Sequence, residues 1–149
     1  MVAQAKNFSI DIGVCTFRRP ELADTLRSLD AMEMPEGFDI RIIVADNDDT
    51  PTARDLVMAL SQELTVPIRY QHCPARNISI ARNACLDASI ADFVAFIDDA
   101  CSATHSWLAQ LVAMAQQSGA AAVLGPVRAR YRPNAPDWMR RGDFHSTLP

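Results

Sequence analysis

Residues 38–51, which have the sequence FDIRIIVADNDDTP, decide the fold of this chain. Every second residue from Phe38 to Val44 is apolar, and this two-residue period is typical of a β-strand with one buried face. The strand ends in a polar run, residues 46–49. Thr50 and the proline that follows it then predict the beginning of a helix, with Thr50 as its N-cap. The stretch therefore predicts one strand–turn–helix unit.

The same unit recurs on both sides of this stretch. Apolar periodicity predicts further strands at residues 8–14, 66–70, 93–97 and 120–127, and helices at 20–29, 50–64, 77–88 and 107–115. The nearly continuous apolar run 93–97 favours a strand buried on both faces, and Pro67 favours an edge position for 66–70. No regular element is predicted after Arg128. Strands alternating with helices predict an α/β fold, a Rossmann-like, mostly parallel sheet with helices on both faces.

Composition limits the classes of protein to which the chain can belong. It has 149 residues, of which 49% are hydrophobic and 21% are charged, and its formal net charge is −4. These values indicate one ordinary globular domain and argue against a nucleic acid partner. Basic residues gather locally, above all from Arg128 to Arg141, which suits a small anionic ligand.

Cysteine usage and the N-terminal sequence bear on location. Four cysteines (Cys15, Cys73, Cys85 and Cys101) are spread without a C-x-x-C pair, so we expect free thiols in a reducing compartment. The chain begins without the apolar segment of a secretory signal, and no run reaches the roughly 18 apolar residues of a membrane span. A cytoplasmic location is the expectation.

Ligands of parallel α/β sheets bind beyond the carboxyl ends of the strands, which directs attention to three polar strand ends. These are residues 16–19, which are basic, and 46–49 and 98–99, which are acidic. Two adjacent carboxylates, Asp98 and Asp99, repel each other unless a cation lies between them, and oxygen ligands suit Mg²⁺ or Mn²⁺. The alternative is that both carboxylates cap the following helix.

Other polar residues at these ends suit a nucleotide. Asp46 and Asn47 have the hydrogen-bonding groups to hold a ribose or a base, although an Asx turn accounts for them equally well. Arg76, at the start of the third helix, is expected on one face with Ser79 and Asn83, with Arg82 beside them, where a phosphate is favoured. Arg18 and Arg19 are candidates for diphosphate oxygens. Each arginine has a surface role as its alternative, and the scattered histidines and cysteines do not predict zinc.

Four of these segments together resemble the family 2 glycosyltransferases, over roughly residues 8–130. The segments are Ile12–Pro20 with its threonine, Ile42–Asn47, the Ala-Arg-Asn helix segment Ile80–Leu86, and Phe93–Asp99, which resembles the strand before the family's Asp-x-Asp metal motif. The Asn-Ile-Ser-Ile-Ala-Arg-Asn segment is further similar to transferases of bacterial exopolysaccharide assembly, such as the succinoglycan enzymes.

The resemblance implies the nucleotide-sugar-binding half of a GT-A fold at residues 1–130. The reaction implied is inverting transfer of a sugar from a nucleoside diphosphate sugar, a UDP-sugar by preference, to a saccharide or lipid-linked acceptor, with Mg²⁺ or Mn²⁺ on the diphosphate. Peripheral association with the inner face of the membrane is compatible with this role. The nucleotide-binding residues implied are Thr16, Arg18, Asp46, Asn47, Arg82 and Asp98, and the metal ligands are Asp98 and Asp99.

Two departures from the family pattern matter. Ala100 stands where the metal motif has its second Asp, with Asp99 as the substitute. The acceptor-binding half that supplies the catalytic base in the family is expected after the last strand, with residues 131–149 as its start, and no base is assigned. A non-catalytic nucleotide-sugar-binding module is the alternative function. A receiver domain is disfavoured, because it needs an acidic pair where Thr16 to Arg19 stand.

Overall fold

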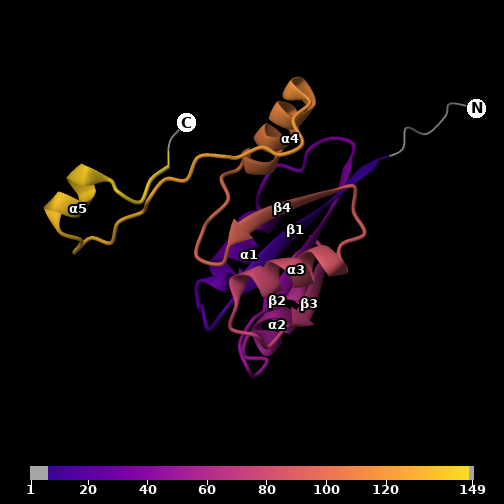
Figure 1. Ribbon diagram of the computed structural model, residues 1–149, viewed down its shortest axis with the longest axis horizontal. Helices are drawn as coiled ribbons and strands as arrows, with labels where there is room; N and C mark the ends of the chain where they lie inside the picture. Colours follow the sequence, from indigo (N-terminus) through magenta and orange to yellow (C-terminus); the bar gives the residue numbers. More distant parts are fainter. Residues whose placement is uncertain (1–6, 148–149) are drawn as a thin grey trace, which may run out of the picture. The chain divides into compact units, whose positions relative to one another are not determined.

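The computed structural model describes residues 7–147 and contains a four-stranded parallel sheet. Its strands are β1 (Phe8–Thr16), β2 (Phe38–Asp46), β3 (Ile68–His72) and β4 (Phe93–Asp98), in the order β3-β2-β1-β4. The strands run in the same direction, so their carboxyl ends share one edge (Figure 1). The predicted α/β class and the edge position of β3 are confirmed.

Helices α1 (Leu22–Asp30), α2 (Arg54–Glu63) and α3 (Ile78–Ala88) connect the strands. The sheet has two apolar faces because side chains alternate along β1 and β2. One face carries Cys15, Ile43 and Ala45, against which the small residues of α3 pack. The other carries fully buried Ile12, Val14, Ile42 and Val44, on the side of the buried leucines of α1 and α2. Helices therefore cover both faces, as predicted.

Gly13 allows α3 and β4 to approach β1 closely. A Cβ atom at this position would lie 2.6 Å from the ring of Phe96 and 3.2 Å from Cβ of Cys85. Both separations are tighter than normal packing allows, so a side chain here would force the helix or the ring away. The glycine is needed for space, and α3 consequently lies directly over β1.

Three local predictions were wrong. Residues 120–127 form no strand; only Val127 makes an isolated bridge, to Thr147, and Leu124 is 96% exposed. Thr50 does not cap α2, which begins at Arg54 after Ala53. Strand β4 is not buried on both faces, because it lies at the edge of the four-stranded sheet and Phe93 and Phe96 are exposed.

The chain divides into two compact units, one ending at Ala109 and the other beginning at Gln110. The division falls inside α4 (Trp107–Ser118), whose Leu108 is buried. The second unit includes a short helix that sequence analysis missed, α5 (Asp137–Gly142), which ends at Asp143 in a left-handed conformation. Among the described residues, no helix has the length and apolarity required to cross a membrane.

A charged pair lies beneath α3, in the amino-terminal half of β1 and β2. Asp11 is buried, and Arg41 is partly exposed. Arg41 donates two hydrogen bonds, of 2.8 and 2.7 Å, to the Asp11 carboxylate, and Ser89 Oγ donates a third at 2.7 Å. Burial alone would raise the pKa of Asp11, but Arg41 and Ser89 outweigh it and hold the pKa below its ordinary value. The pair joins β1, β2 and the end of α3.

We expect Asp11→Asn to lower the free energy of unfolding by about 2–3 kcal/mol, because it leaves the largely buried Arg41 without its charge partner. Urea unfolding at pH 7 measures the change. Asp55→Asn, at an exposed position on α2, is the matched control and should shift stability by no more than about 0.5 kcal/mol. Equal effects of the two substitutions would contradict the structural role of Asp11.

Candidate functional site at the carboxyl edge of the sheet

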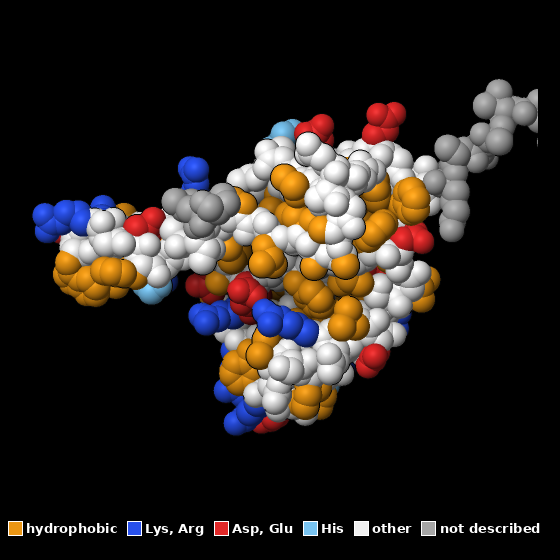
Figure 2. Space-filling view, turned by 45° about the horizontal axis from the view of Figure 1, so that its top comes forward, with side chains coloured by type: hydrophobic (Ala, Val, Ile, Leu, Met, Phe, Trp, Pro, Cys, Tyr) orange, Lys and Arg blue, Asp and Glu red, His pale blue; other side chains and the backbone are white. Residues whose placement is uncertain are grey.

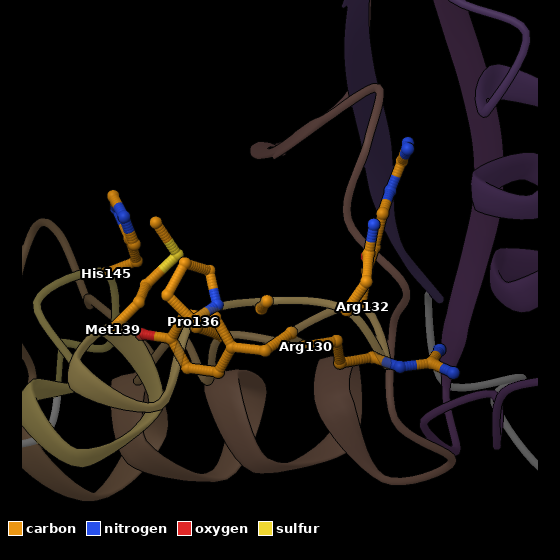
Figure 3. Close-up of a pocket in the computed structure, with 9 residues that line it drawn as sticks. Arg130, Arg132, Pro136, Met139 and His145 are labelled. Carbon is orange, nitrogen blue, oxygen red and sulfur yellow. The ribbon is translucent and has the colours of Figure 1, made fainter.

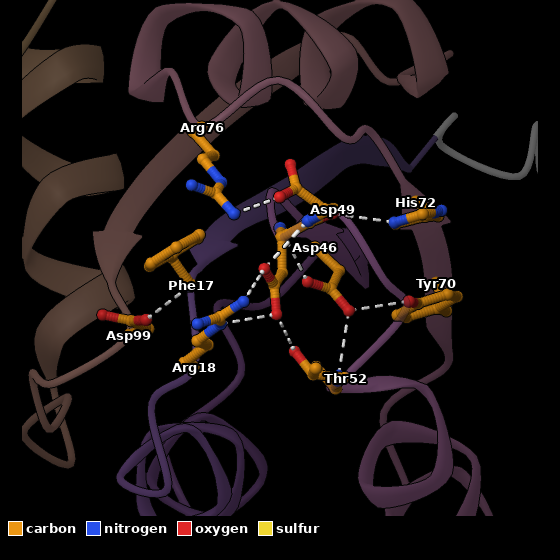
Figure 4. A network of polar contacts seen from close by, with 11 residues as sticks. Phe17, Arg18, Asp46, Asp49, Thr52, Tyr70, His72, Arg76 and Asp99 are labelled. Carbon is orange, nitrogen blue, oxygen red and sulfur yellow. Dashed lines mark hydrogen bonds and ion pairs between the residues drawn. The ribbon is translucent and has the colours of Figure 1, made fainter.

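Asp46, the last residue of β2, is fully buried, and both of its carboxylate oxygens are used within the chain. One oxygen accepts from the Tyr70 hydroxyl at 2.8 Å and from the Ala53 amide at 2.9 Å, and the other accepts from the Asp48 amide at 3.2 Å (Figure 4). Asp46 therefore holds Ala53, the residue just before α2, and Thr50 is too far from Arg54 to be the N-cap of this helix. The burial of Tyr70 itself, and then its hydrogen bond to Asp46, raise the pKa of the Tyr70 hydroxyl.

Asn47 joins β1 to the start of α3. Its backbone amide donates to the Thr16 carbonyl at 2.9 Å, and its side-chain oxygen accepts from the Asn77 amide at 3.2 Å. Asn77 in turn is the N-cap of α3, and its side chain accepts from the amide of Ser79 at 2.9 Å. The position of the helix start thus depends on the end of β2.

Asp48, which sequence analysis did not single out, is fully buried and fixes the loop after β1. Arg18 donates two hydrogen bonds to it, at 2.8 and 2.9 Å, and Thr52 Oγ1 donates one at 3.1 Å. The Arg18 guanidinium is the main cause of a pKa of about 2 for Asp48, so this carboxylate stays ionised at any physiological pH. His72 Nε2 lies 2.8 Å from the Asp48 carbonyl oxygen and donates to it.

Asp49 forms an ion pair with Arg76, just as Asp48 pairs with Arg18. Arg18 and Arg76 both have left-handed backbones, with φ values of 55° and 47°. Residues other than glycine adopt this conformation only when their surroundings enforce it, and such strain gathers at functional sites. The two neighbouring aspartates supply that enforcement, and they hold both arginine-bearing loops against the edge of the sheet.

A cavity of about 420 Å³ opens at this edge, between the ends of the strands and the start of α3. Its volume is typical of small-molecule sites. The residues that line it come from the end of β1, the turn after β2, the start of α3 and the end of β4: Cys15, Thr16, Phe17, Arg19, Asn47, Arg76, Ile78 and Asp99. Two arginines, an amide, a carboxylate and two apolar side chains therefore face one space.

Two polar groups in this cavity are unusual. Thr16 is buried, and its hydroxyl has no hydrogen-bond partner among the described residues. Asp99 accepts from the Phe17 amide at 3.4 Å, and partial burial raises the pKa of its carboxyl. The Thr16 hydroxyl is near enough to oppose this rise without reaching hydrogen-bond geometry. A buried group with no partner is disfavoured unless a ligand satisfies it.

The two predicted metal ligands diverge. Asp99 turns toward the β1 loop, whereas Asp98 is 72% exposed and lies 3.6 Å from the Arg82 guanidinium. Within residues 7–147, no three acidic, histidine or cysteine side chains are placed to hold a metal ion. Ala100, which follows this pair, is exposed.

The predicted site residues separate into three groups. Thr16, Asn47 and Asp99 line the cavity, whereas Asp46 and Arg18 support it from beneath or beside, and Arg82 and Asp98 pair with each other next to it. The prediction that Arg76 shares a helix face with Ser79 and Asn83 is wrong, because Arg76 precedes α3. Phe17 and Ile78 were missed, and they had no signal in the sequence beyond their nearness to Thr16 and Asn77.

The second unit has a cavity of its own, of about 490 Å³. Pro136 and Met139 lie along its floor, with His145 and Arg132 on either side (Figure 3). Tyr131, another lining residue, donates a 2.8 Å hydrogen bond to Asp143, and Arg140 holds the loop before α5 by donating to the carbonyl of Arg132 at 2.9 Å. Exposed Trp138 and Phe144 lie beside each other, and basic and hydrophobic side chains occur together on this unit (Figure 2).

The sheet order and the cavity at its carboxyl edge define the ligand-binding half of a Rossmann-like α/β protein. The sequence profile of glycosyl transferase family 2 matches residues 11–148, and the chain belongs to this family. It is 63% identical over 140 residues to the succinoglycan biosynthesis protein ExoM of Rhizobium meliloti (strain 1021). That match covers 94% of this chain and 45% of ExoM, so the chain spans about half the length of this relative.

Solved structures agree with this fold. TarS of S. aureus superposes with a TM-score of 0.61 at 18% identity, over 74% of this chain and 20% of TarS. Its residues 1–349 were also solved with UDP-GlcNAc, with a TM-score of 0.60 at 16% identity, over 73% of this chain and 31% of that one. The mannosyltransferase PcManGT from Pyrobaculum calidifontis, in complex with GDP-Man and Mn²⁺, gives 0.59 at 19% identity, over 91% and 39%. The fold is that of GT-A glycosyltransferases.

We expect Asp48→Asn to destabilise the protein in a pH-dependent way. A carboxyl whose pKa is lowered by folding stabilises the folded state above its unfolded pKa of about 3.9 and loses this contribution as pH falls. The difference in unfolding free energy between wild type and variant should therefore be complete above about pH 5 and disappear near pH 2. Urea unfolding between these values measures it. Asp49→Asn, in the solvent-exposed pair, should give a smaller difference; a pH-independent effect of Asp48→Asn would contradict the assignment.

Proposed function

We propose that the cavity at the carboxyl edge of the sheet binds a nucleoside diphosphate sugar, by preference a UDP-sugar, as the donor of a glycosyl transfer. The observation that carries the proposal is that Thr16, whose buried hydroxyl has no partner among the described residues, lines a cavity that Arg19 and Arg76 also line. Arg19 and Arg76 suit the diphosphate, because guanidinium groups bind phosphate oxygens in bidentate geometry. TarS, solved with UDP-GlcNAc and with UDP, supports a uridine nucleotide.

The remaining groups of the cavity suit the nucleoside. Phe17 and Ile78 offer apolar surface to a base, while Thr16 and Asn47 offer hydrogen bonds to its edge or to the ribose. Asp46 and Arg18, which we expected to touch the nucleotide, act in this proposal by holding the turn and the β1 loop in place. Arg82 is close enough to the site to meet the donor when its pairing with Asp98 opens.

A divalent cation, Mg²⁺ or Mn²⁺, fits the oxygen donors at the end of β4. Such ions are often held by one or two carboxylates together with substrate phosphates, so the absence of a three-ligand cluster among the described residues does not conflict with binding. Asp98 and Asp99 would hold the ion, which would stabilise the leaving diphosphate as a Lewis acid. PcManGT, solved with Mn²⁺, supports this part of the proposal.

The reaction that we propose for the whole protein is inverting transfer to a saccharide or lipid-linked acceptor. An acceptor hydroxyl, deprotonated by a carboxylate base that we do not assign, attacks the anomeric carbon on the face opposite the diphosphate. Residues 131–149 begin the acceptor-binding part, a role supported by the arginine-rich cavity of the second unit. The similarity to ExoM supports a role in exopolysaccharide assembly. The location that belongs to this proposal is the cytoplasm, at the inner face of the membrane.

A second candidate function is a nucleotide-sugar-binding module without catalysis. It is favoured by Ala100 in the place of the metal motif's second Asp, and by the divergence of Asp98 and Asp99. The two functions share the donor cavity and differ in the cation.

Donor binding is tested by calorimetric titration of the chain with UDP, GDP and their sugars, with and without Mn²⁺. We expect tighter binding of the uridine nucleotides. Thr16→Val, which keeps the shape and removes the hydroxyl, should weaken UDP binding about tenfold, because one hydrogen bond to a buried group is lost. It should leave the free energy of unfolding unchanged or raise it by about 1 kcal/mol, since the hydroxyl is unsatisfied in the free protein.

Weaker UDP binding without a loss of stability separates a binding role of Thr16 from a structural one. If Thr16 were structural, the substitution would lower stability and affinity together. If no nucleotide binds the unmodified chain at concentrations where GT-A proteins are saturated, the donor assignment is wrong. Ser79→Ala, at an exposed position on α3 outside the lining of the cavity, serves as the control and should change neither quantity.

Ala100→Asp tests the cation. Residue 100 is exposed, so an Asp is accommodated there without loss of packing. We expect the ratio of UDP affinities with and without Mn²⁺ to rise by about tenfold or more, the effect of one added carboxylate ligand. Ala100→Asn, which matches the shape without the charge, is the control. An unchanged ratio in Ala100→Asp would show that the end of β4 does not bind the metal and would favour the non-catalytic module.

A further inference from the structure

Three cysteines gather between the sheet and α3, and the proposed function uses none of their sulfur atoms. Cys15 on β1 and Cys85 on α3 are buried in one cluster of small residues, and Cys73, which follows β3, packs against that cluster. All are free thiols. Their position next to the donor cavity, rather than their number, makes the group notable.

The packing of Gly13 brings Cys15 and Cys85 together. Gly13 and Cys15 are two residues apart on β1 and so face the same side of the sheet. Because Cβ of Cys85 would lie 3.2 Å from a Cβ on Gly13, the α3 cysteine sits directly over this part of β1. Both cysteines belong to one buried cluster, in which the Cys85 thiol also lies 3.8 Å from the Ile43 carbonyl oxygen.

The other cysteines have different partners. The Cys73 thiol is directed to the Asp46 carbonyl oxygen, at 3.4 Å. Cys101 lies beyond β4, where its amide donates to the Asp98 carbonyl and its own carbonyl is 2.7 Å from Thr25 Oγ1. Cys15 and Cys85 are therefore the two of the four cysteines that belong to the buried cluster itself.

Only one member of the pair can be reached from outside. Cys15 is 9% exposed and lines the donor cavity, whereas Cys85 is completely buried behind it. A small oxidant that enters the cavity meets Cys15 first, with Cys85 placed to react next. Reactive sites of this kind consist of one accessible thiol and a neighbouring resolving thiol.

We propose that Cys15 and Cys85 are a redox-active thiol pair, which a peroxide converts to a disulfide that impairs the donor cavity. The Cys15 thiol ionises, its thiolate attacks one peroxide oxygen and the O–O bond breaks. The departing hydroxide takes up the proton that Cys15 lost and leaves as the first water, with a sulfenic acid formed on Cys15. The Cys85 sulfur then attacks the Cys15 sulfur, the S–O bond breaks, and a second water leaves. Two thiols and one peroxide thus give one disulfide and two waters.

The effect on the cavity follows from what α3 carries. A disulfide is about 2.05 Å long and holds the two Cβ atoms in a narrow range of separations, so its formation constrains how α3 packs on β1. Ile78, in the first turn of α3, lines the cavity, and its N-cap Asn77 is bonded to Asn47. Movement of the helix therefore alters the donor cavity. The consequence for donor binding rests on the proposed function.

The pair is tested by treating the reduced chain with one equivalent of hydrogen peroxide and mapping disulfides without reduction. Cleavage after arginine and before aspartate separates all four cysteines into different peptides. We expect a loss of two hydrogens in mass and a cross-link between the Cys15 and Cys85 peptides. The absence of this cross-link, or a dominant one to Cys73 or Cys101, would overturn the proposal.

The effect on the cavity is tested by titrating UDP into reduced, oxidised and re-reduced protein. We expect oxidation to weaken binding about tenfold, and a thiol reductant to restore it. Two variants remove one thiol each: Cys85→Ala, which matches the neighbouring alanines of α3, and Cys15→Ser. In each variant we expect the same UDP affinity before and after peroxide and reductant treatment. Cys101→Ser, the matched control, should respond as the wild type does.

The outcomes distinguish the two proposals. A cross-link that leaves UDP affinity unchanged, or an affinity loss that persists in Cys85→Ala, overturns the redox proposal while the donor site stands. If the reduced chain binds no nucleotide, the donor assignment fails. The cross-link and the accompanying change in melting temperature then still decide whether the thiol pair exists, and its effect on a donor cavity is rejected.

Discussion

The structure depends on the hydrogen bonds made by four consecutive polar residues at the end of β2, residues 46–49 (Figure 4). Each ties this turn to a different element: Asp46 to β3 and α2, Asn47 to β1 and the start of α3, Asp48 to the loop after β1, and Asp49 to the loop before α3. Carboxylates can do this because each accepts several hydrogen bonds while it remains charged. The donor cavity is the space that these contacts leave at the edge of the sheet.

This arrangement explains why so many charges lie at a site proposed for a negatively charged ligand. Three acids of the turn are neutralised locally or buried, and two of them hold arginine-bearing loops in left-handed conformations. Arg19 and Arg76 reach the cavity as a result. A preorganised site avoids part of the ordering entropy that binding otherwise requires. Because the site is rigid, the constraint that the proposed disulfide places on α3 would alter the shape of the cavity.

Much of the fold was predictable because its signals are local. The alternation in residues 38–44 and the apolar periodicity of 20–29 and 77–88 depend on near neighbours, and the structure has β2, α1 and α3 in these places. Residues 120–127 look like a strand by composition, but the single bridge from Val127 to Thr147 is their only pairing among the described residues, and a strand needs a longer ladder. Helix α2 starts at Arg54, later than Thr50 predicted, and the amide of Ala53 just before it bonds to Asp46, seven residues earlier in the chain.

The sequence by itself determined the α/β class, the family and the three strand ends that surround the site, because periodicity and motif spacing are properties of the chain. Only the tertiary structure decided which polar residues face the cavity. Asp46 and Asn47 are adjacent in the sequence, yet one is sealed beneath the turn and the other lines the space. The pairing of Cys15 with Cys85 likewise required β1 and α3 to meet across Gly13. Side-chain direction and long-range contact are set by packing, which no local pattern encodes.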